Sequence, residues 1–339
     1  MKRALAIFLA LSAVLIAQQA APEDEEEYLH RALSEAGTSP VEFIRAIENH
    51  LEKFPQSSRR PDLERALVKA AIDAKDDRRI LVFGERVLER EKDDLEILDR
   101  VTRLLIAKGD AESAKRALDY ARRYGEVVRS VRNDEPESPR AKARWREQVD
   151  RGLGEALLME ARAQANLGRR DEAVALARRS YDTFPSAEAA RAIGNQLSLL
   201  GKEREALAHF ADAFSIPDPN GDEIDRARIR QRLGEIYRKL NGTEAGLGDL
   251  ILEAYDRTSA RMERRKLNLQ ALDPNAGISN PMDFTMSSLG GEPLPLASLR
   301  GKVIVFDFWA TWCGPCRVQH PLYEQVKERF RENPGVVFL

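Results

Sequence analysis

The sequence predicts an all-α helical array followed by a partial α/β domain, and three observations carry this prediction. Residues 62–135 and 140–184 contain no proline and are rich in Ala, Leu, Glu and Arg, as expected of helices joined by short turns. Within residues 24–269 a sequence block recurs after 33 residues. Beyond residue 281 the pattern changes to short runs of β-branched and aromatic residues, which are typical of strands.

Composition limits the class of protein. The chain has 339 residues, of which 43% are hydrophobic, so it is long enough for about two domains with cores of their own. Its 54 basic and 56 acidic side chains give a net charge of -2, which excludes nucleic-acid binding by a basic surface of the whole chain. Two cysteines permit at most one internal disulfide and exclude a four-thiolate metal site.

The amino end has the pattern of a targeting segment. Lys2 and Arg3 precede residues 4–17, which carry no charge, and small residues and an acidic run follow. Because the apolar run is shorter than the ~18 residues of a spanning helix, we predict a secretory signal peptide over residues 1–21 and export to the periplasm. The alternative is an uncleaved anchor in the inner membrane, with the rest of the chain facing the periplasm.

Residues 22–270 are predicted to form helical repeats. Residues 167–173 (Leu-Gly-Arg-Arg-Asp-Glu-Ala) recur as residues 200–206 (Leu-Gly-Lys-Glu-Arg-Glu-Ala), and a weaker match relates 74–77 to 107–110. A period of about 34, with two helices and a Gly-containing turn, resembles the tetratricopeptide repeat. Such repeats stack to cover their apolar faces, and this resemblance implies a surface that binds or positions a protein partner. The alternative is that the array is only a spacer or a dimerisation element.

A change in composition marks a second domain. Residues 271–281 are rich in turn formers and are predicted to be a linker, and an α/β pattern follows over residues 282–339. The predicted elements of residues 282–339 are a strand at 283–287, a strand buried on both faces of a sheet at 303–308, a helix at 317–331 and a strand at 336–339.

The sequence Trp312-Cys313-Gly314-Pro315-Cys316 joins the second predicted strand to the helix. A thiolate at the start of a helix meets unpaired backbone N–H groups and the helix dipole, which lower its pKa below about 8.5. Cys313 is therefore predicted to be the exposed attacking thiol, and Cys316 to resolve a mixed disulfide from one helical turn away. Pro315 has no N–H to leave unpaired in the first turn, and Gly314 permits close approach of a partner chain.

Residues 306–316 resemble the active-site strand and turn of thioredoxin. Residues 284–303, which precede them, resemble the exported TlpA-type disulfide reductases. The resemblance covers about residues 282–339 and implies a thioredoxin fold that performs dithiol–disulfide exchange without a cofactor or a metal.

The same resemblance assigns roles to individual residues. It implies that Asp307 relays a proton to the second cysteine and that Pro321 kinks the active-site helix. It also implies that Trp309 and Trp312 support the site around the two cysteines.

Other interpretations of the two cysteines are less favoured. Zinc binding would need two more ligands, and none of the four histidines stands at a zinc-finger spacing. A purely structural disulfide across a helix terminus would close too small a loop to stabilise the fold much. A peroxiredoxin-like peroxidase normally has a Thr three residues before its cysteine, whereas Thr311 stands two before Cys313. His320 could face Cys316 along the helix, but we favour a solvent-facing position for it.

The thioredoxin fold normally continues beyond a strand such as 336–339 with a hairpin, a last helix and a loop that bears a cis-proline. An apolar strand without a partner on its outer side is an unprotected edge. We therefore expect residues 282–339 to be a truncated thioredoxin-like domain from a longer natural chain.

Together these inferences predict an exported thiol–disulfide oxidoreductase that reduces protein disulfides. Its electrons would come from a membrane or periplasmic dithiol donor, and its helical repeats would hold a protein partner. Reduction is the favoured direction because the Gly-Pro pair between the cysteines resembles thioredoxin, whose potential is about -270 mV. The alternative is a repeat-based binding scaffold whose partial redox segment is inactive.

Overall fold

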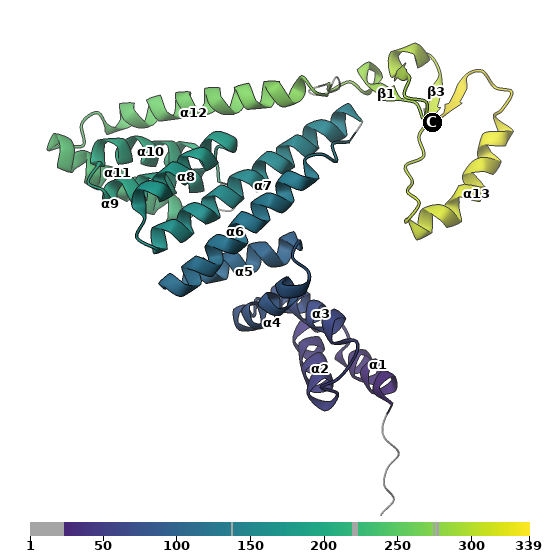
Figure 1. Ribbon diagram of the computed structural model, residues 1–339. Coiled ribbons are helices and arrows are strands. Elements are labelled where there is room, and N and C mark those ends of the chain that lie inside the picture. Colours follow the sequence, from purple (N-terminus) through teal and green to yellow (C-terminus); the bar gives the residue numbers. More distant parts are fainter. Residues whose placement is uncertain (1–23, 137, 219–222, 274, 276–277) are drawn as a thin grey trace, which may run out of the picture. The chain divides into compact units, whose positions relative to one another are not determined.

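The computed structural model describes residues 24–136, 138–218, 223–273, 275 and 278–339 (Figure 1). The predicted signal peptide at residues 1–21 lies outside these residues. The helices that precede residue 271 are α1 (Glu25–Ala36), α2 (Pro40–Lys53), α3 (Arg60–Asp73), α4 (Asp77–Arg90), α5 (Leu95–Lys108), α6 (Ala111–Val131), α7 (Pro139–Asn166), α8 (Arg170–Thr183), α9 (Ala187–Leu199), α10 (Glu203–Ser215), α11 (Glu223–Asn241) and α12 (Leu247–Gln270). This order confirms the predicted all-α array. No helix in the described ranges is both long and apolar enough to cross a bilayer.

The chain divides into two units, with the boundary between Leu104 and Leu105 inside α5. The first unit contains α1 to α4, whose consecutive helices pack against one another. Two of its helix starts are capped by side chains: the Ser39 hydroxyl accepts a hydrogen bond from the Glu42 N–H, and the Asp76 carboxylate accepts one from the Arg79 N–H. These caps satisfy N–H groups that have no partner within the helix.

The turn between the two helices of a repeat has the same backbone conformation at four places. Gly109, Gly168 and Gly201 have φ values of 75°, 78° and 75°, and Lys75 has a φ of 54°. A left-handed residue reverses the chain at a helix end, and glycine adopts it without steric cost. The predicted inter-helix turns are therefore confirmed in position.

At the turn between α3 and α4, the structure shifts the alignment of residues 74–77 with residues 107–110 by one residue. The sequence match paired Lys75 with Lys108, but the left-handed residue opposite Lys75 is Gly109. The capping aspartates, Asp76 and Asp110, shift in the same way. Identical residue types aligned Lys75 with Lys108, whereas the left-handed backbone and the capping aspartates align Lys75 with Gly109.

A cluster of buried apolar residues joins α7 to α12, and Phe210 lies within it. The Phe210 ring packs on Gly194 of α9, where an added Cβ would stand 3.1 Å from the ring. Because contacts that short are rare for real Cβ atoms, glycine at this position lets α9 and α10 approach closely without displacing the ring.

Helix α12 packs against α10 and α7 through a row of three arginines, Arg257, Arg261 and Arg265, spaced four residues apart. Arg257 donates to the buried carboxylate of Asp212 on α10, at 2.5 Å. The other oxygen of Asp212 accepts the Tyr181 hydroxyl of α8, at 3.3 Å. Asp212 thus holds α8 and α12 to α10.

The other two arginines of the row bind helices earlier in the chain. Arg261 donates to Asp182 of α8 at 2.6 Å, and Arg265 donates to Asp150 of α7 at 3.1 Å. The guanidinium groups of Arg151 and Arg265 both contact the Phe184 ring, 4.7 and 4.9 Å from its centroid. One face of α12 is therefore fixed to three different helices.

The carboxyl-terminal segment, residues 278–339, is a small α/β unit. Its elements are a 3₁₀ turn at Pro281–Asp283, β1 (Thr285–Ser287), β2 (Pro293–Pro295), a 3₁₀ turn at Leu296–Leu299, β3 (Val303–Val305), α13 (Gly314–Arg329) and β4 (Val336–Phe338). Strands β1 and β2 pair antiparallel, and β3 pairs parallel with β4, so that Val303 lies opposite Val336 and Val305 opposite Phe338.

Two predictions for this segment are corrected. Strand β3 ends at Val305 rather than at Phe308, and it is not buried on both faces, since Val303 is 62% exposed. Among the described residues only β4 pairs with it, so the apolar run has one neighbour instead of two. Helix α13 begins at Gly314, three residues before the predicted start, because Cys313 caps it.

Candidate active site

Cys313 and Cys316 lie at the amino end of α13 and form a disulfide, with their Cα atoms 5.3 Å apart. Cys313 is the N-cap residue, in extended conformation, and its Sγ accepts a hydrogen bond from the Cys316 N–H at 3.3 Å. The N–H of Cys313 donates to the Ala310 carbonyl at 3.0 Å, which closes the turn before the helix. Both cysteines are half-buried, so both sulfurs lie near the surface.

This position supplies a reason for thiol reactivity. A cap residue faces the first N–H groups of its helix, which have no acceptor within the helix. The hydrogen bond from Cys316 shows that Sγ of Cys313 takes the place of a capping oxygen. A thiolate there would be stabilised by this donor and by the helix dipole. Pro315, in the first turn, has no N–H to leave unpaired.

Asp307 lies just beyond β3, and its backbone N–H donates to the Leu339 carbonyl at 3.0 Å. Its side chain is half-buried rather than fully enclosed. Nδ1 of His320 is 4.0 Å from Oδ2 of Asp307, within the range of an ion pair when the imidazole is charged. The structure thus brings Asp307 to the second turn of α13.

The imidazole of His320 contacts two aromatic rings. Its centroid is 5.7 Å from that of Trp309 and 6.4 Å from that of Tyr323. The Tyr323 ring in turn meets Phe338 of β4 edge-on, at 5.7 Å. Burial raises the pKa of the Tyr323 hydroxyl, and the Asp307 carboxylate adds to that effect. The prediction that His320 faces solvent is confirmed, since 47% of its side chain is exposed, whereas its contacts with Trp309 and Asp307 were not predicted.

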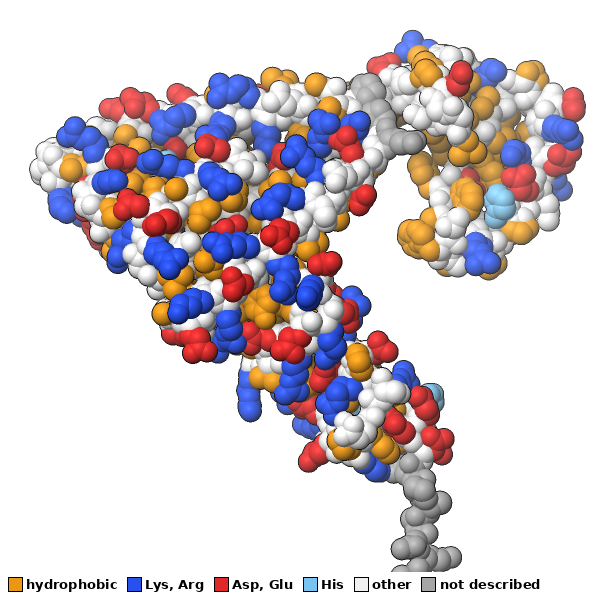
Figure 2. All heavy atoms as spheres, viewed as in Figure 1, with side chains coloured by type: hydrophobic (Ala, Val, Ile, Leu, Met, Phe, Trp, Pro, Cys, Tyr) orange, Lys and Arg blue, Asp and Glu red, His pale blue; other side chains and the backbone are white. Residues whose placement is uncertain are grey.

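The residues predicted to support the site fall into two groups. Trp309 packs on His320, whereas Trp312, next to Cys313, is 87% exposed. Figure 2 shows hydrophobic side chains gathered on this part of the surface. Pro321 lies inside α13, where its ring nitrogen cannot donate to the carbonyl of Arg317. An exposed indole beside a surface disulfide is suited to contact a partner chain.

The described residues contain no group of three His, Cys, Asp or Glu side chains arranged to hold a metal ion. The geometry brings together two pairs of reactive groups, Cys313 with Cys316 at the start of α13 and Asp307 with His320 at its second turn. Together they can support thiol–disulfide exchange, which needs an attacking thiolate, a resolving thiol and a proton acceptor.

Comparison with known proteins bears on this segment. The Redoxin family matches residues 276–339. The segment is thioredoxin-like. The thioredoxin-like protein YneN of Bacillus subtilis is 38% identical over 55 residues, 16% of this chain and 32% of YneN. The thiol:disulfide interchange protein HelX of Rhodobacter capsulatus is 41% identical over 76 residues, 20% of this chain and 43% of HelX.

Other comparisons add less. The thiol-disulfide oxidoreductase ResA of Bacillus thuringiensis is 32% identical over 51 residues, 15% of this chain and 30% of ResA. This chain therefore spans about a third of the length of the curated relatives that its thioredoxin-like segment matches. Among solved structures, a thermophilic TPR protein of Thermus thermophilus superposes with a TM-score of 0.35 and 20% identity, covering 62% of this chain and 99% of that one.

Proposed function

We propose that this protein is an exported thiol–disulfide oxidoreductase that reduces protein disulfides. The observation that carries the proposal is the Cys313–Cys316 disulfide at the N-cap of α13, beside the exposed Trp312. The names of HelX and ResA support the same class of reaction. Export rests on the charge and apolar pattern of residues 1–21.

The reaction begins from the reduced dithiol, which a membrane or periplasmic dithiol donor regenerates by exchange. The Cys313 thiolate attacks one sulfur of a substrate disulfide, the substrate bond breaks, and its other sulfur leaves as a thiolate that takes up a proton. Cys316 then loses its proton and attacks Sγ of Cys313. The mixed disulfide breaks, the Cys313–Cys316 bond forms, and the substrate leaves as a dithiol two electrons richer.

Within this proposal Asp307 accepts the Cys316 proton, and the helical array holds a protein partner. The half-buried carboxylate beside α13 supports the first role. The alternative function is a binding scaffold in which the dithiol takes no part.

A direct test measures the reduction of insulin by dithiothreitol. We expect the protein to accelerate the appearance of insulin turbidity, and Cys313→Ser to leave only the uncatalysed rate, because no thiolate remains to attack. If the protein and the Cys313→Ser variant gave the same rate, the chemistry would be absent and the scaffold function would stand.

Replacing Asp307 by Asn is expected to slow the second step by about a hundredfold, the lower end of the range for a positioned base, since the side chain is only half-buried. Asn keeps the backbone hydrogen bond to Leu339 but cannot accept the proton. Stopped-flow measurement of Trp fluorescence after mixing with a disulfide would follow this step. Alkylation of Cys313 by iodoacetamide should stay within about twofold of wild type, because attack does not use Asp307. Equal slowing of both steps would point to a structural defect instead of a proton relay.

A further inference from the structure

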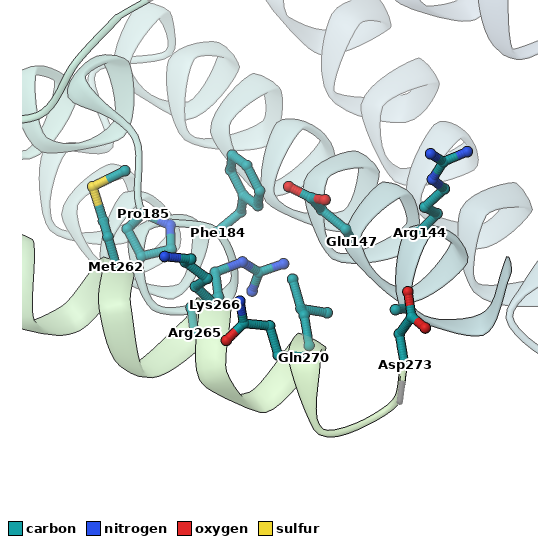
Figure 3. A pocket seen from close by; sticks show the side chains of 11 residues that line it. Arg144, Glu147, Phe184, Pro185, Met262, Arg265, Lys266, Gln270 and Asp273 are labelled. Carbon is teal, nitrogen blue, oxygen red and sulfur yellow. The ribbon is translucent and has the colours of Figure 1, made fainter. Parts of the chain in front are cut away.

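A hollow of about 420 Å³ is lined by α7, α12 and the turn that follows α8 (Figure 3). Its charged lining consists of three cations, Arg144, Arg265 and Lys266, and two carboxylates, Glu147 and Asp273. Because charges of both signs stand on its walls, the hollow favours neither an anionic nor a cationic ligand. The side chains whose contacts bear on the chemistry of the protein lie on α13 instead.

Cys316, His320 and Tyr323 lie on one face of α13, because their spacings of four and three residues match the turn of a helix. The contacts of the last two show where this face points. Nδ1 of His320 is 4.0 Å from Oδ2 of Asp307, and the Tyr323 ring meets Phe338 of β4. The face that carries Cys316 is therefore the side of α13 turned toward β4 and the end of β3.

His320 stands between the resolving thiol and the carboxylate. Residues four apart on a helix have Cβ atoms about 5–6 Å apart, and helical side chains lean toward the amino end, so the imidazole leans over the turn that begins at Cys316. The Trp309 ring contacts the imidazole, with 5.7 Å between centroids, and limits the orientations it can adopt. The 4.0 Å from Nδ1 to Asp307 is longer than a hydrogen bond, and such contacts commonly shorten when a site holds its reactant.

The other titratable side chains of α13 are less suited to take the Cys316 proton. The guanidinium of Arg317, the next residue, is always charged and has no acceptor. Burial raises the pKa of the Tyr323 hydroxyl, so this group keeps its own proton. Lys327 and Glu324 bond to each other at 3.3 Å, farther along the helix. A neutral imidazole, in contrast, has one nitrogen that accepts a proton and one that donates.

We propose that the proton of Cys316 reaches Asp307 through the imidazole of His320. This proposal rests on the function proposed above and names the group that joins its two pairs of reactive side chains.

In the resolving step Nε2 of His320 takes the Cys316 proton, while the proton on Nδ1 passes to Oδ2 of Asp307. The Cys316 thiolate attacks Sγ of Cys313, the bond from that sulfur to the substrate breaks, and its electron pair leaves with the substrate sulfur. His320 and Asp307 are both partly exposed, so they return to their starting protonation states by exchange with water.

Stopped-flow measurement of Trp fluorescence on the full chain follows this step in variants. We expect His320→Ala and Asp307→Asn each to slow it by about a hundredfold, and the double variant to be no more than about twofold slower than either, because both residues serve one path. Two independent contributions would instead multiply to about ten-thousandfold. His30→Ala, which removes an exposed histidine of α1, is the matched control and should resolve as wild type.

Two further measurements separate proton transfer from packing. His320→Gln keeps a planar polar side chain that cannot take up a proton, so it should be as slow as His320→Ala. Free imidazole should accelerate His320→Ala more than Asp307→Asn, because only the former lacks the base that imidazole supplies. Alkylation of Cys313 by iodoacetamide should stay within about twofold of wild type in every variant, since that reaction does not use the relay.

Resolution by His320→Ala at the wild-type rate, or a double variant slowed by the product of the two single effects, would overturn the relay. A slow His320→Ala that imidazole did not accelerate would overturn it too, because the loss would then come from packing. These outcomes leave the proposed function intact. Failure of the wild-type chain to accelerate insulin reduction would overturn both proposals.

Discussion

Replacing Cys316 by Ser is expected to trap substrate proteins on Cys313 as mixed disulfides. The wild-type adduct is resolved from within, by a thiol whose Cα is only 5.3 Å from that of Cys313. Without that thiol, resolution needs an external one and slows by on the order of a thousandfold or more, the advantage of an intramolecular reaction. Non-reducing gels of cells that express the variant should show adducts that disappear on reduction.

The control for this trap is the double variant Cys313→Ser, Cys316→Ser, which should give no adducts. A second control, Cys313→Ser alone, separates the roles of the two thiols, because Cys316 lies inside the first turn and should trap little. Equal adducts on Cys313 and Cys316 would contradict the assignment of attacker and resolver. A clean gel with the Cys316→Ser variant would contradict the proposed chemistry itself.

Replacing Phe210 by Ala is expected to lower the free energy of unfolding by about 3–5 kcal/mol. Phe210 is 2% exposed, and its ring fills the space that Gly194 leaves between α9 and α10. Truncation would leave a cavity that the rigid helices close only in part. Denaturant unfolding followed by far-UV circular dichroism measures the change.

Leu199→Ala is the matched control for this loss. Leu199 is 63% exposed at the end of α9, so its truncation should change stability by no more than about 0.5 kcal/mol. If Phe210→Ala and Leu199→Ala had the same denaturation midpoint, the contact between Phe210 and Gly194 would not be a stabilising core contact.

The sequence predicted the helical array well because its signals are local. Helix formers, missing prolines and Gly-containing turns each depend on a few neighbouring residues, and the turns at Gly168 and Gly201 lie where the repeat placed them. The error at Lys75 shows where local reasoning failed. A lysine in left-handed conformation gives no signal of its own, and only the capping carboxylate of Asp76 marks the helix start.

The candidate site was predicted in part. The cysteine pair is contiguous in sequence, so its place at a helix start followed from the motif. The cluster of Asp307, Trp309 and His320 did not follow, because it depends on the phase of α13. A helix that begins at Gly314 instead of Arg317 changes which side chains meet the residues after β3. Such a long-range contact has no periodic signature in the sequence.

The arginine row has a mechanical consequence. The chain leaves α12 at Gln270, so a pull on the residues beyond it acts first on the bonds of Arg265 to Asp150 and Thr183, then on those of Arg261, and on Arg257 last. A pulling force would thus break the contacts of these three arginines one after another instead of all at once. Tension applied at the carboxyl side would peel α12 away gradually while the buried Asp212 anchor still held.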